Sequence, residues 1–428
     1  MTIMIELLVG AACYVTFYAV LPGVGSIMQI LGLALLACAA AYAVVMNKIK
    51  PLPVSATELI MFALGVLYVS VAVFNDPDTL LSSIAFLSAI ILISIVSRTL
   101  TLDRLLDVGA CVALMGVVTS IIVDYHEAIA ALSITIGRRG LERFAPLGTH
   151  PDLTGYLFGA GAILISRRAI ITDSLMERAI MALGTLASFL FVLAASARAS
   201  LVALAVAVIL SVAVEFGLKR ILGLMWVRIG GVLLALCCIV FSDKIFSYFG
   251  KILEVDSSYR GVATGGTGRT VLWARGVAAV FDDSTRLVLG GGFRSSGLSG
   301  IGFSTESSYI TILLDSGLFL GAAVIFAFWY APIKALKLTD RATRHSSSLV
   351  MLATFMTFVV MESFFNRYLL AIGNPISLTT LLILFSLSMR PNLAAVAPGP
   401  QSFSGVAVRG VGPQRTPPDG RADPSQAH

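Results

Sequence analysis

The chain has 428 residues, of which 57% are hydrophobic and only 13% are charged. Soluble proteins carry roughly 25% charged residues, so this composition excludes an ordinary water-soluble globular protein. The net charge of +6 would suit a nucleic-acid binder, but the basic residues are scattered between long apolar runs, as membrane topology signals are. We therefore expect a lipid bilayer, and no nucleic acid, as a partner.

The apolar runs predict an all-α polytopic membrane protein. Backbone polar groups in hydrocarbon must be paired within the protein, and a run such as 199–214 does not alternate as a β-barrel strand does. The first run lacks the basic flank and cleavage site of a signal peptide and is read as retained. We expect about twelve transmembrane helices. They lie near residues 5–21, 24–46, 57–74, 79–97, 105–123, 152–166, 177–195, 199–217, 225–242, 308–333, 346–364 and 375–389.

Basic residues follow the even-numbered spans. They are Lys48, Lys50, Arg98, Arg104, Arg167, Arg168, Lys219, Arg220, Lys334, Lys337, Arg341 and Arg344. By the positive-inside rule these breaks face the cytoplasm, which makes both termini cytoplasmic. Two long extracytoplasmic loops are then expected, at about 124–151 and, between spans nine and ten, at about 242–307. The transmembrane domain is predicted over 1–390, and the tail at 391–428, rich in Pro, Gly, Ser and Ala, is predicted to be disordered and cytoplasmic.

Both long loops carry arginines, against the local charge bias. An anionic ligand bound on the outer face would account for them, because guanidinium groups match phosphate oxygens. The alternative is that long loops cross the membrane largely regardless of charge.

The first polar pattern, in chain order, is ERFAPLGTHPDLTGYL at 142–157. Arg143 precedes a turn that contains His150 and leads through Pro151 into the sixth span, where proline suits a helix start. The second pattern is AASARASL at 194–201, in which Arg198 separates two apolar runs. Arginine so close to hydrocarbon is costly unless it extends to the interface or finds a partner, and both interpretations stay open.

The third pattern runs from Gly265 to Gly321. Arg269 and Trp273 open a stretch, 270–281, that could form a short amphipathic helix on the membrane surface. Three glycines at 290–292 allow a tight turn or a close approach to a ligand. Glu306 lies where the loop becomes the tenth span, so its carboxylate could accept a proton from a hydroxyl or merely complement the helix dipole.

Metal and cofactor signatures are missing from the sequence. The four histidines lie far apart without ligand spacing, and neither a phosphate-binding loop nor a dinucleotide fingerprint occurs. The five cysteines all lie in apolar runs and read as small buried residues. We expect no metal and no cofactor.

Together these patterns resemble the O-antigen ligase and polymerase superfamily of bacterial envelope polysaccharide enzymes. The resemblance covers about 100–390 and rests on 143–157, Ser196–Arg198, Gly268–Arg269 with Trp273, Gly290–Gly292 and Glu306–Gly321. Ligases of that family usually carry a His-Asn pair where this chain has Glu306 and Ser307. The chain is therefore more similar to the exopolysaccharide polymerase branch, such as the xanthan-type polymerases.

The resemblance implies a metal-independent glycosyltransferase on the outer face of the bacterial inner membrane. Its substrate would be an undecaprenyl-diphosphate-linked oligosaccharide, and a repeat-unit flippase and a chain-length regulator are implied partners. Arg143, Arg198 and Arg269, with His150 and Tyr309, would bind substrate, and Glu306 would be catalytic. Ligation to lipid A-core or to a protein, a polysaccharide transporter or flippase, and a non-catalytic export factor remain alternatives.

Overall fold

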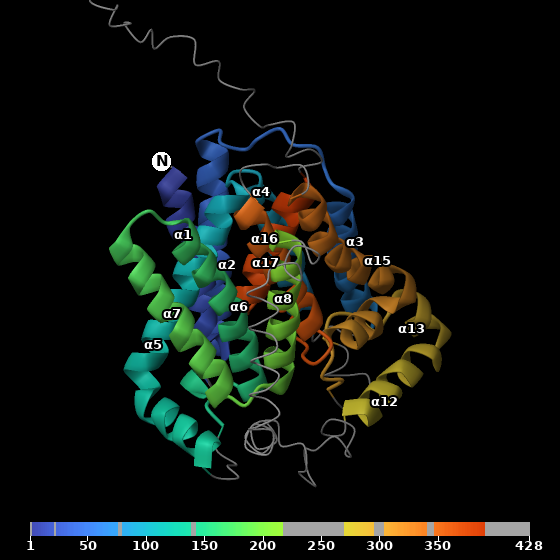
Figure 1. Cartoon of the computed structure of the whole chain (residues 1–428). Coiled ribbons are helices and arrows are strands. Elements are labelled where there is room, and N and C mark those ends of the chain that lie inside the picture. Colours follow the sequence, from blue (N-terminus) through green and yellow to red (C-terminus); the bar gives the residue numbers. More distant parts are fainter. Residues whose placement is uncertain are drawn as a thin grey trace, which may run out of the picture. The chain divides into compact units, whose positions relative to one another are not determined.

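The computed structural model describes residues 2–20, 23–75, 79–137, 143–216, 269–294, 304–339 and 346–389. Over these ranges the chain is helical and contains no β-strand (Figure 1). The predicted ninth span at 225–242, most of the predicted loop at 242–307 and the predicted tail at 391–428 lie outside the described residues.

The helices follow the predicted order of spans. They are α1 Thr2–Val15 with the 3-10 turn η1 Thr16–Val20, α2 Gly25–Val45, α3 Ala56–Asn75, α4 Leu80–Ser97, α5 Leu102–Gly137, η3 Pro146–Gly148, α6 Pro151–Ile171, α7 Leu175–Ala194, α8 Arg198–Phe216, α12 Arg269–Phe281, α13 Ser284–Leu289, α15 Ser308–Thr339, α16 Ser346–Glu362 and α17 Pro375–Ser388.

Within the described residues, 7 helices are long and apolar enough to cross a membrane: α1 with η1, α2, α3, α4, α5, α7 and α15. Parts of α8 and α16, and all of α17, are apolar but shorter. Large apolar side chains such as Phe74, Leu81 and Phe319 point away from the protein, as they do on a lipid-facing surface. The chain is therefore a polytopic α-helical membrane protein, while the predicted number of twelve spans stays a prediction.

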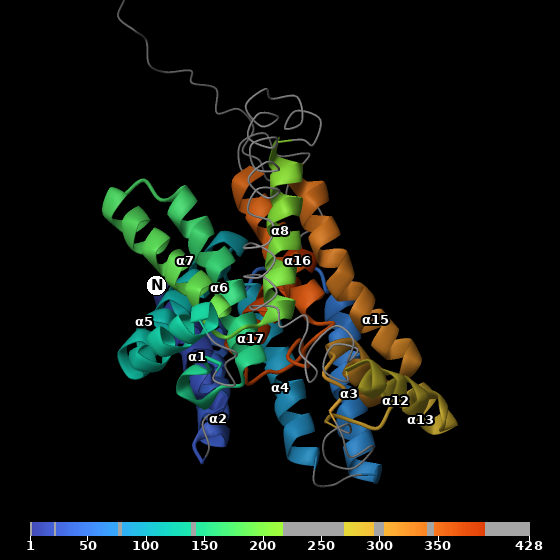
Figure 2. The ribbon, with the colours of Figure 1, turned by 60° about the horizontal axis from the view of Figure 1, so that its bottom comes forward.

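Helices α6 and α17 are buried on nearly all sides, which sets them apart from the lipid-facing helices. Helix α6 lies against α5, α7, α8 and α16, and Figures 1 and 2 show it inside the bundle. It is not among the strongly apolar helices because it contains Asp152, Arg167 and Arg168. A helix that packs against protein on every side can carry such groups, since neighbouring side chains satisfy them.

The predicted extracytoplasmic loop at about 124–151 begins as helix. Helix α5 continues to Gly137 after a kink at Asp124, whose φ is −124° and ψ 26°, and where the chain leaves the membrane stays a prediction. The Asp124 Oδ2 accepts a hydrogen bond of 2.8 Å from the Leu147 N–H, which ties the kink to the following loop. The residues after the kink have good helix propensity, so the helix resumes.

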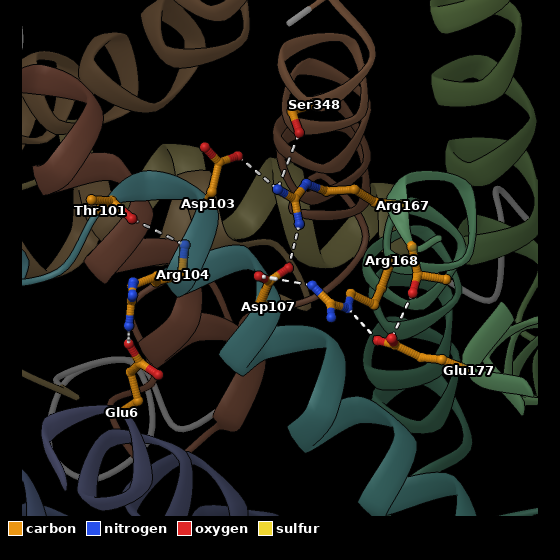
Figure 3. A network of polar contacts seen from close by, with 10 residues as sticks. Glu6, Thr101, Asp103, Arg104, Asp107, Arg167, Arg168, Glu177 and Ser348 are labelled. Atoms are coloured by element: carbon orange, nitrogen blue, oxygen red, sulfur yellow. Dashed lines mark hydrogen bonds and ion pairs between the residues drawn. The ribbon is translucent and has the colours of Figure 1, made fainter. Parts of the chain in front are cut away.

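One end of the bundle, here called the paired end, holds the connections at 46–55, 98–101 and 172–174. Buried Arg167 donates to Asp103 Oδ1 and to Asp107 Oδ1 at 2.7 Å each, and to Ser348 Oγ at 3.1 Å (Figure 3). The network continues from Asp107 through Arg168 to Glu177. It joins α5, α6, α7 and α16, so these four helices are fixed to one another at this end.

A second ion pair at the paired end joins α3 to the end of α4. Arg98 donates to both oxygens of Glu58 at 2.8 and 3.0 Å. Glu58 also closes a reciprocal capping arrangement with Ser55 at the start of α3, with bonds of 2.8 and 3.1 Å. The cap and the ion pair therefore depend on one carboxylate.

Candidate functional site

The opposite end of the bundle, here called the site end, brings two arginines to one carboxylate. Arg143 Nη2 donates to Asp152 Oδ1 at 2.7 Å, and Arg269 Nη2 donates to Asp152 Oδ2 at 2.5 Å. The three side chains come from the segment before α6, the first turn of α6 and the first residue of α12. Their side chains are only 13%, 20% and 18% exposed, in the order Arg143, Asp152, Arg269, so the cluster is largely shielded from solvent.

The local sequence explains how Asp152 is positioned. His150 is the N-cap of α6 and its Nδ1 accepts a bond of 3.3 Å from the Asp152 N–H. Pro151 occupies the first turn, where its missing N–H costs nothing. Asp152 therefore lies where the helix dipole favours a negative charge.

Arg143 is held by backbone carbonyls where α7 ends. Its Nε donates to Ala195 O at 2.7 Å and its Nη2 to Ser196 O at 3.2 Å. Ser196 has a φ of 48°, which a side chain adopts at some cost. The Ser196 carbonyl also accepts a bond of 3.1 Å from the N–H of Arg198, the first residue of α8. The Arg143 guanidinium thus lies on the connection that presents Arg198.

Backbone strain gathers at the site end. Four of the five non-glycine residues with positive φ among those described are Leu147, Ser196, Arg294 and Glu306, and the fifth, Asn47, lies at the paired end. Each such residue costs on the order of 1–3 kcal/mol and is kept only where the surrounding structure imposes it. Such strain tends to gather at functional sites.

Glu306 lies in the segment 304–307 that leads into α15, with a φ of 51°. This segment is fastened to the connection between α16 and α17. The Ser308 N–H and Oγ both donate to Asn366 O at 2.6 Å, and Arg367 Nη1 donates to Ser304 Oγ at 3.1 Å. The structure therefore fixes the backbone on both sides of Glu306.

Tyr368 lies in the connection between α16 and α17. Burial raises the pKa of the Tyr368 phenol to about 12; Arg367 opposes the rise, and the carboxylates of Glu306 and Asp152 add to it. The negative charges of both carboxylates therefore act on this phenol. Its ring also stacks on that of Tyr156 in α6, with centroids 6.3 Å apart. Glu306 and Asp152 are more than 150 residues apart in sequence, yet both raise the pKa of the same phenol.

A buried carboxylate, Glu362, lies at the end of α16. It is 1% exposed, and its Oε1 accepts a hydrogen bond of 2.8 Å from Ser200 Oγ in the first turn of α8. Asn366 follows on the same connection that holds Ser308. Glu362 therefore ties the start of α8 to the segment that carries Glu306.

The glycine run at 290–292 serves a backbone contact. The Gly291 N–H donates to Leu314 O at 2.8 Å and the Gly292 N–H to Asp315 O at 2.9 Å. Gly290 has a φ of 74°, and a Cβ there would overlap the Asp315 carbonyl; Gly317, with a φ of 75° at the break in α15, would overlap Val288 O in the same way. Figures 1 and 2 show α12 and α13 against α15, which these contacts allow.

The structure thus brings Arg143, His150 and Arg269 together, places Arg198 on an adjoining turn, and puts Glu306 within electrostatic reach. Tyr309 has a packing role: its hydroxyl donates to Val360 O at 2.6 Å, and its ring lies against Phe364. Sequence reasoning did not select Asp152, although its place in the first turn of a helix was a usable signal.

The expected helix at 270–281 is present as α12, and its location on a membrane surface stays a prediction. In the part of the chain that the structure describes, no group of three or more His, Cys, Asp or Glu residues could hold a metal ion.

Comparison of the chain with models of known protein families gives no match, and comparison with curated proteins gives none either. The case for a function therefore rests on the residues and geometry of this site.

Proposed function

We propose that this chain is a membrane glycosyltransferase that polymerises oligosaccharide repeat units linked to undecaprenyl diphosphate on the outer face of the bacterial inner membrane. The observation that carries the proposal is the convergence of Arg143 and Arg269 on Asp152. Two guanidinium groups share one carboxylate there, so positive groups outnumber negative ones among the described contacts of this cluster. The resemblance of the sequence to polysaccharide polymerases points to the same ligand.

A diphosphate is the anion that suits this arrangement best. Arginine donates two parallel N–H bonds to phosphate oxygens, and such charge-assisted bonds are roughly twice as strong as neutral ones. Burial of the cluster strengthens them further, because water does not screen them. Arg198, on the turn that Arg143 contacts, could supply a third guanidinium.

The reaction would proceed by direct displacement. Glu306 accepts the proton of the acceptor hydroxyl, whose oxygen attacks the anomeric carbon of the donor sugar. The bond from that carbon to the diphosphate oxygen breaks, and the electron pair leaves with the lipid diphosphate. Arginines stabilise the charge that builds on the departing oxygen. This path inverts the anomeric centre.

We propose a polymerase and not a ligase because this chain has Glu306 and Ser307 where ligases of the family that it resembles carry His-Asn. Against a transporter, the charged residues of the site gather at one end of the bundle, whereas transporters place substrate groups near the midplane. Cytoplasmic termini, and a flippase and a chain-length regulator as partners, belong to the same proposal.

The test is the size distribution of lipid-linked glycan in cells that lack the protein. Accumulated single repeat units without polymer support the polymerase. Normal-length polymer left on its lipid carrier indicates a ligase, and units trapped on the cytoplasmic face indicate a flippase.

The role of Glu306 is tested by returning variants to those cells. Glu306→Gln should abolish polymer while the protein stays in the membrane in normal amount, because an amide cannot accept the proton. Asp282→Asn, an exposed carboxylate at the end of α12, is the matched control and should leave chain length unchanged. Wild-type chain length in Glu306→Gln would remove Glu306 from the mechanism.

A further inference from the structure

A cavity of about 390 Å³ lies beside the arginine cluster, and the proposed mechanism does not yet use it. It is lined by η1, α2, α3, α6, α15, the residues after α13 and the connection before α17. Its volume falls within the about 300–1,000 Å³ typical of small-molecule sites. Leu153, the neighbour of Asp152, belongs to its wall. So do Ser308 and Arg367, which fasten the segment that carries Glu306.

The polar part of the wall combines both signs of charge with amides. Asp315, in the first half of α15, is 4% exposed, and its Oδ2 accepts a hydrogen bond of 3.2 Å from the Arg294 N–H. Arg294 and Arg367 add guanidinium groups, and Gln29 and Asn374 add amides. The wall therefore offers donors and acceptors together, where a simple anion site would offer donors alone.

The apolar part of the wall combines aliphatic side chains with aromatic rings. The Phe293 ring lies 5.2 Å from that of Tyr68, measured between centroids, and Tyr368 faces the cavity from another side. These are flat apolar surfaces next to hydrogen-bonding groups. A sugar ring presents the same combination, with C–H faces and hydroxyl edges that both donate and accept.

Glycines at two places let the backbone and side chains of the cavity wall lie close together. A Cβ at Gly373 would lie 2.8 Å from the side chain of Gln29, so glycine lets Gln29 lie across the connection before α17. The glycine run at 290–292 presses its backbone onto α15 and so places Arg294 and Asp315 at the wall.

We propose that this cavity binds the terminal sugar of the acceptor glycan and presents its hydroxyl to Glu306. The proposal rests on the proposed function and extends it, because it gives the acceptor a site distinct from that of the donor diphosphate. The buried carboxylate of Asp315 would hold sugar hydroxyls and would repel a phosphate. In the arginine cluster the single carboxylate is already shared between two cations.

The test measures binding to the purified full-length protein in lipid nanodiscs by isothermal titration. The probe is a water-soluble oligosaccharide of one repeat, made by partial acid hydrolysis of the surface polysaccharide of the source cells. Pyrophosphate is the second probe. The proteins compared are wild type, Asp315→Asn, Gln29→Ala and Arg269→Lys, and thermal unfolding checks that each variant is folded.

Oligosaccharide should bind the wild type and Arg269→Lys alike. It should bind Asp315→Asn and Gln29→Ala about tenfold or more weakly, since the first variant loses a charged acceptor and the second loses the side-chain amide. Pyrophosphate affinity should fall in Arg269→Lys and stay unchanged in both cavity variants. Equal oligosaccharide affinity in all four proteins, no binding to the wild type, or loss of pyrophosphate affinity in Asp315→Asn would each overturn the acceptor site.

Failure of the acceptor site and failure of the polymerase proposal give different results. If cells that lack the protein still make normal polymer, the polymerase proposal fails whatever the titration shows. If single repeat units accumulate in those cells while the cavity variants bind oligosaccharide normally, only the acceptor site fails.

Discussion

The two ends of the bundle use the same charged groups in opposite ratios. At the paired end, one buried cation, Arg167, lies between two carboxylates, Asp103 and Asp107. At the site end, one carboxylate, Asp152, lies between two cations, Arg143 and Arg269. At the paired end Asp107 also pairs with Arg168, which in turn pairs with Glu177, so three carboxylates and two arginines are joined in one network. Among the described contacts of the site end, the cations outnumber the carboxylate.

This difference separates a structural use of ion pairs from one prepared for a ligand. Buried charges are tolerated when partners and hydrogen bonds satisfy them, as the Arg167 network does across four helices (Figure 3). At the site end two arginines face one carboxylate, and we propose that they hold a bound anion. Three predictions test the contrast, in order of decreasing effect.

Replacing Arg167 with Ala should have the largest effect on stability. The change removes the buried guanidinium that Asp103, Asp107 and Ser348 share and opens space inside the bundle. Asp107 keeps Arg168 and Asp103 is 68% exposed, so we expect a cost of about 3 kcal/mol, the lower end of the range for breaking a buried pair. We expect a strong fall in the thermal unfolding temperature of the detergent-solubilised protein. Added pyrophosphate should not restore it, because this end has no surplus of positive charge. Unchanged stability would show that the network is not a structural clamp.

Replacing Asp152 with Asn should have an intermediate effect of about 2 kcal/mol, since two guanidinium groups lose a charged acceptor. Here added pyrophosphate should restore much of the lost stability, because an anion that binds the folded state stabilises it. Thermal unfolding with and without pyrophosphate measures both quantities. If pyrophosphate does not change the unfolding temperature of this variant, the site end does not hold an anion.

Replacing Arg104 with Gln should have the smallest effect, about 0.5 kcal/mol. Arg104 pairs with Glu6 at the paired end, but its side chain is 48% exposed, so water and salt screen the pair. We expect the difference from wild type to disappear in 1 M salt, on the order of ten times physiological ionic strength. A loss as large as that of Arg167→Ala would show that burial does not govern these pairs.

Parts of the candidate site were accessible to sequence reasoning because they are local. Arg143 with His150 and Pro151, and Glu306 at a helix entry, lie in short polar patterns next to apolar runs, and such patterns indicate a helix start. Asp152 was overlooked because its importance depends on Arg269, which lies 117 residues away. Tyr309 stands out in the sequence only by its place in the pattern, whereas its neighbours Val360 and Phe364 come from α16 and the connection after it.

Loop boundaries were less accessible. The kink at Asp124 interrupts α5 without ending it, because the residues beyond it favour a helix and Leu147 satisfies the Asp124 side chain. Hydropathy reports where a segment leaves the hydrocarbon, and a helix can continue past that point.

The sequence by itself determined that the chain is an α-helical membrane protein, where most helices begin and end, and which arginines stand out against the charge bias. These properties depend on composition and on neighbours a few residues apart. Only the tertiary structure decided that Arg143 and Arg269 share Asp152, that Glu362 braces α8, and that Asp315 faces a cavity. The reason is physical: an ion pair or a cavity depends on groups that packing brings within a few ångströms, and residues far apart in sequence meet only when the helices pack.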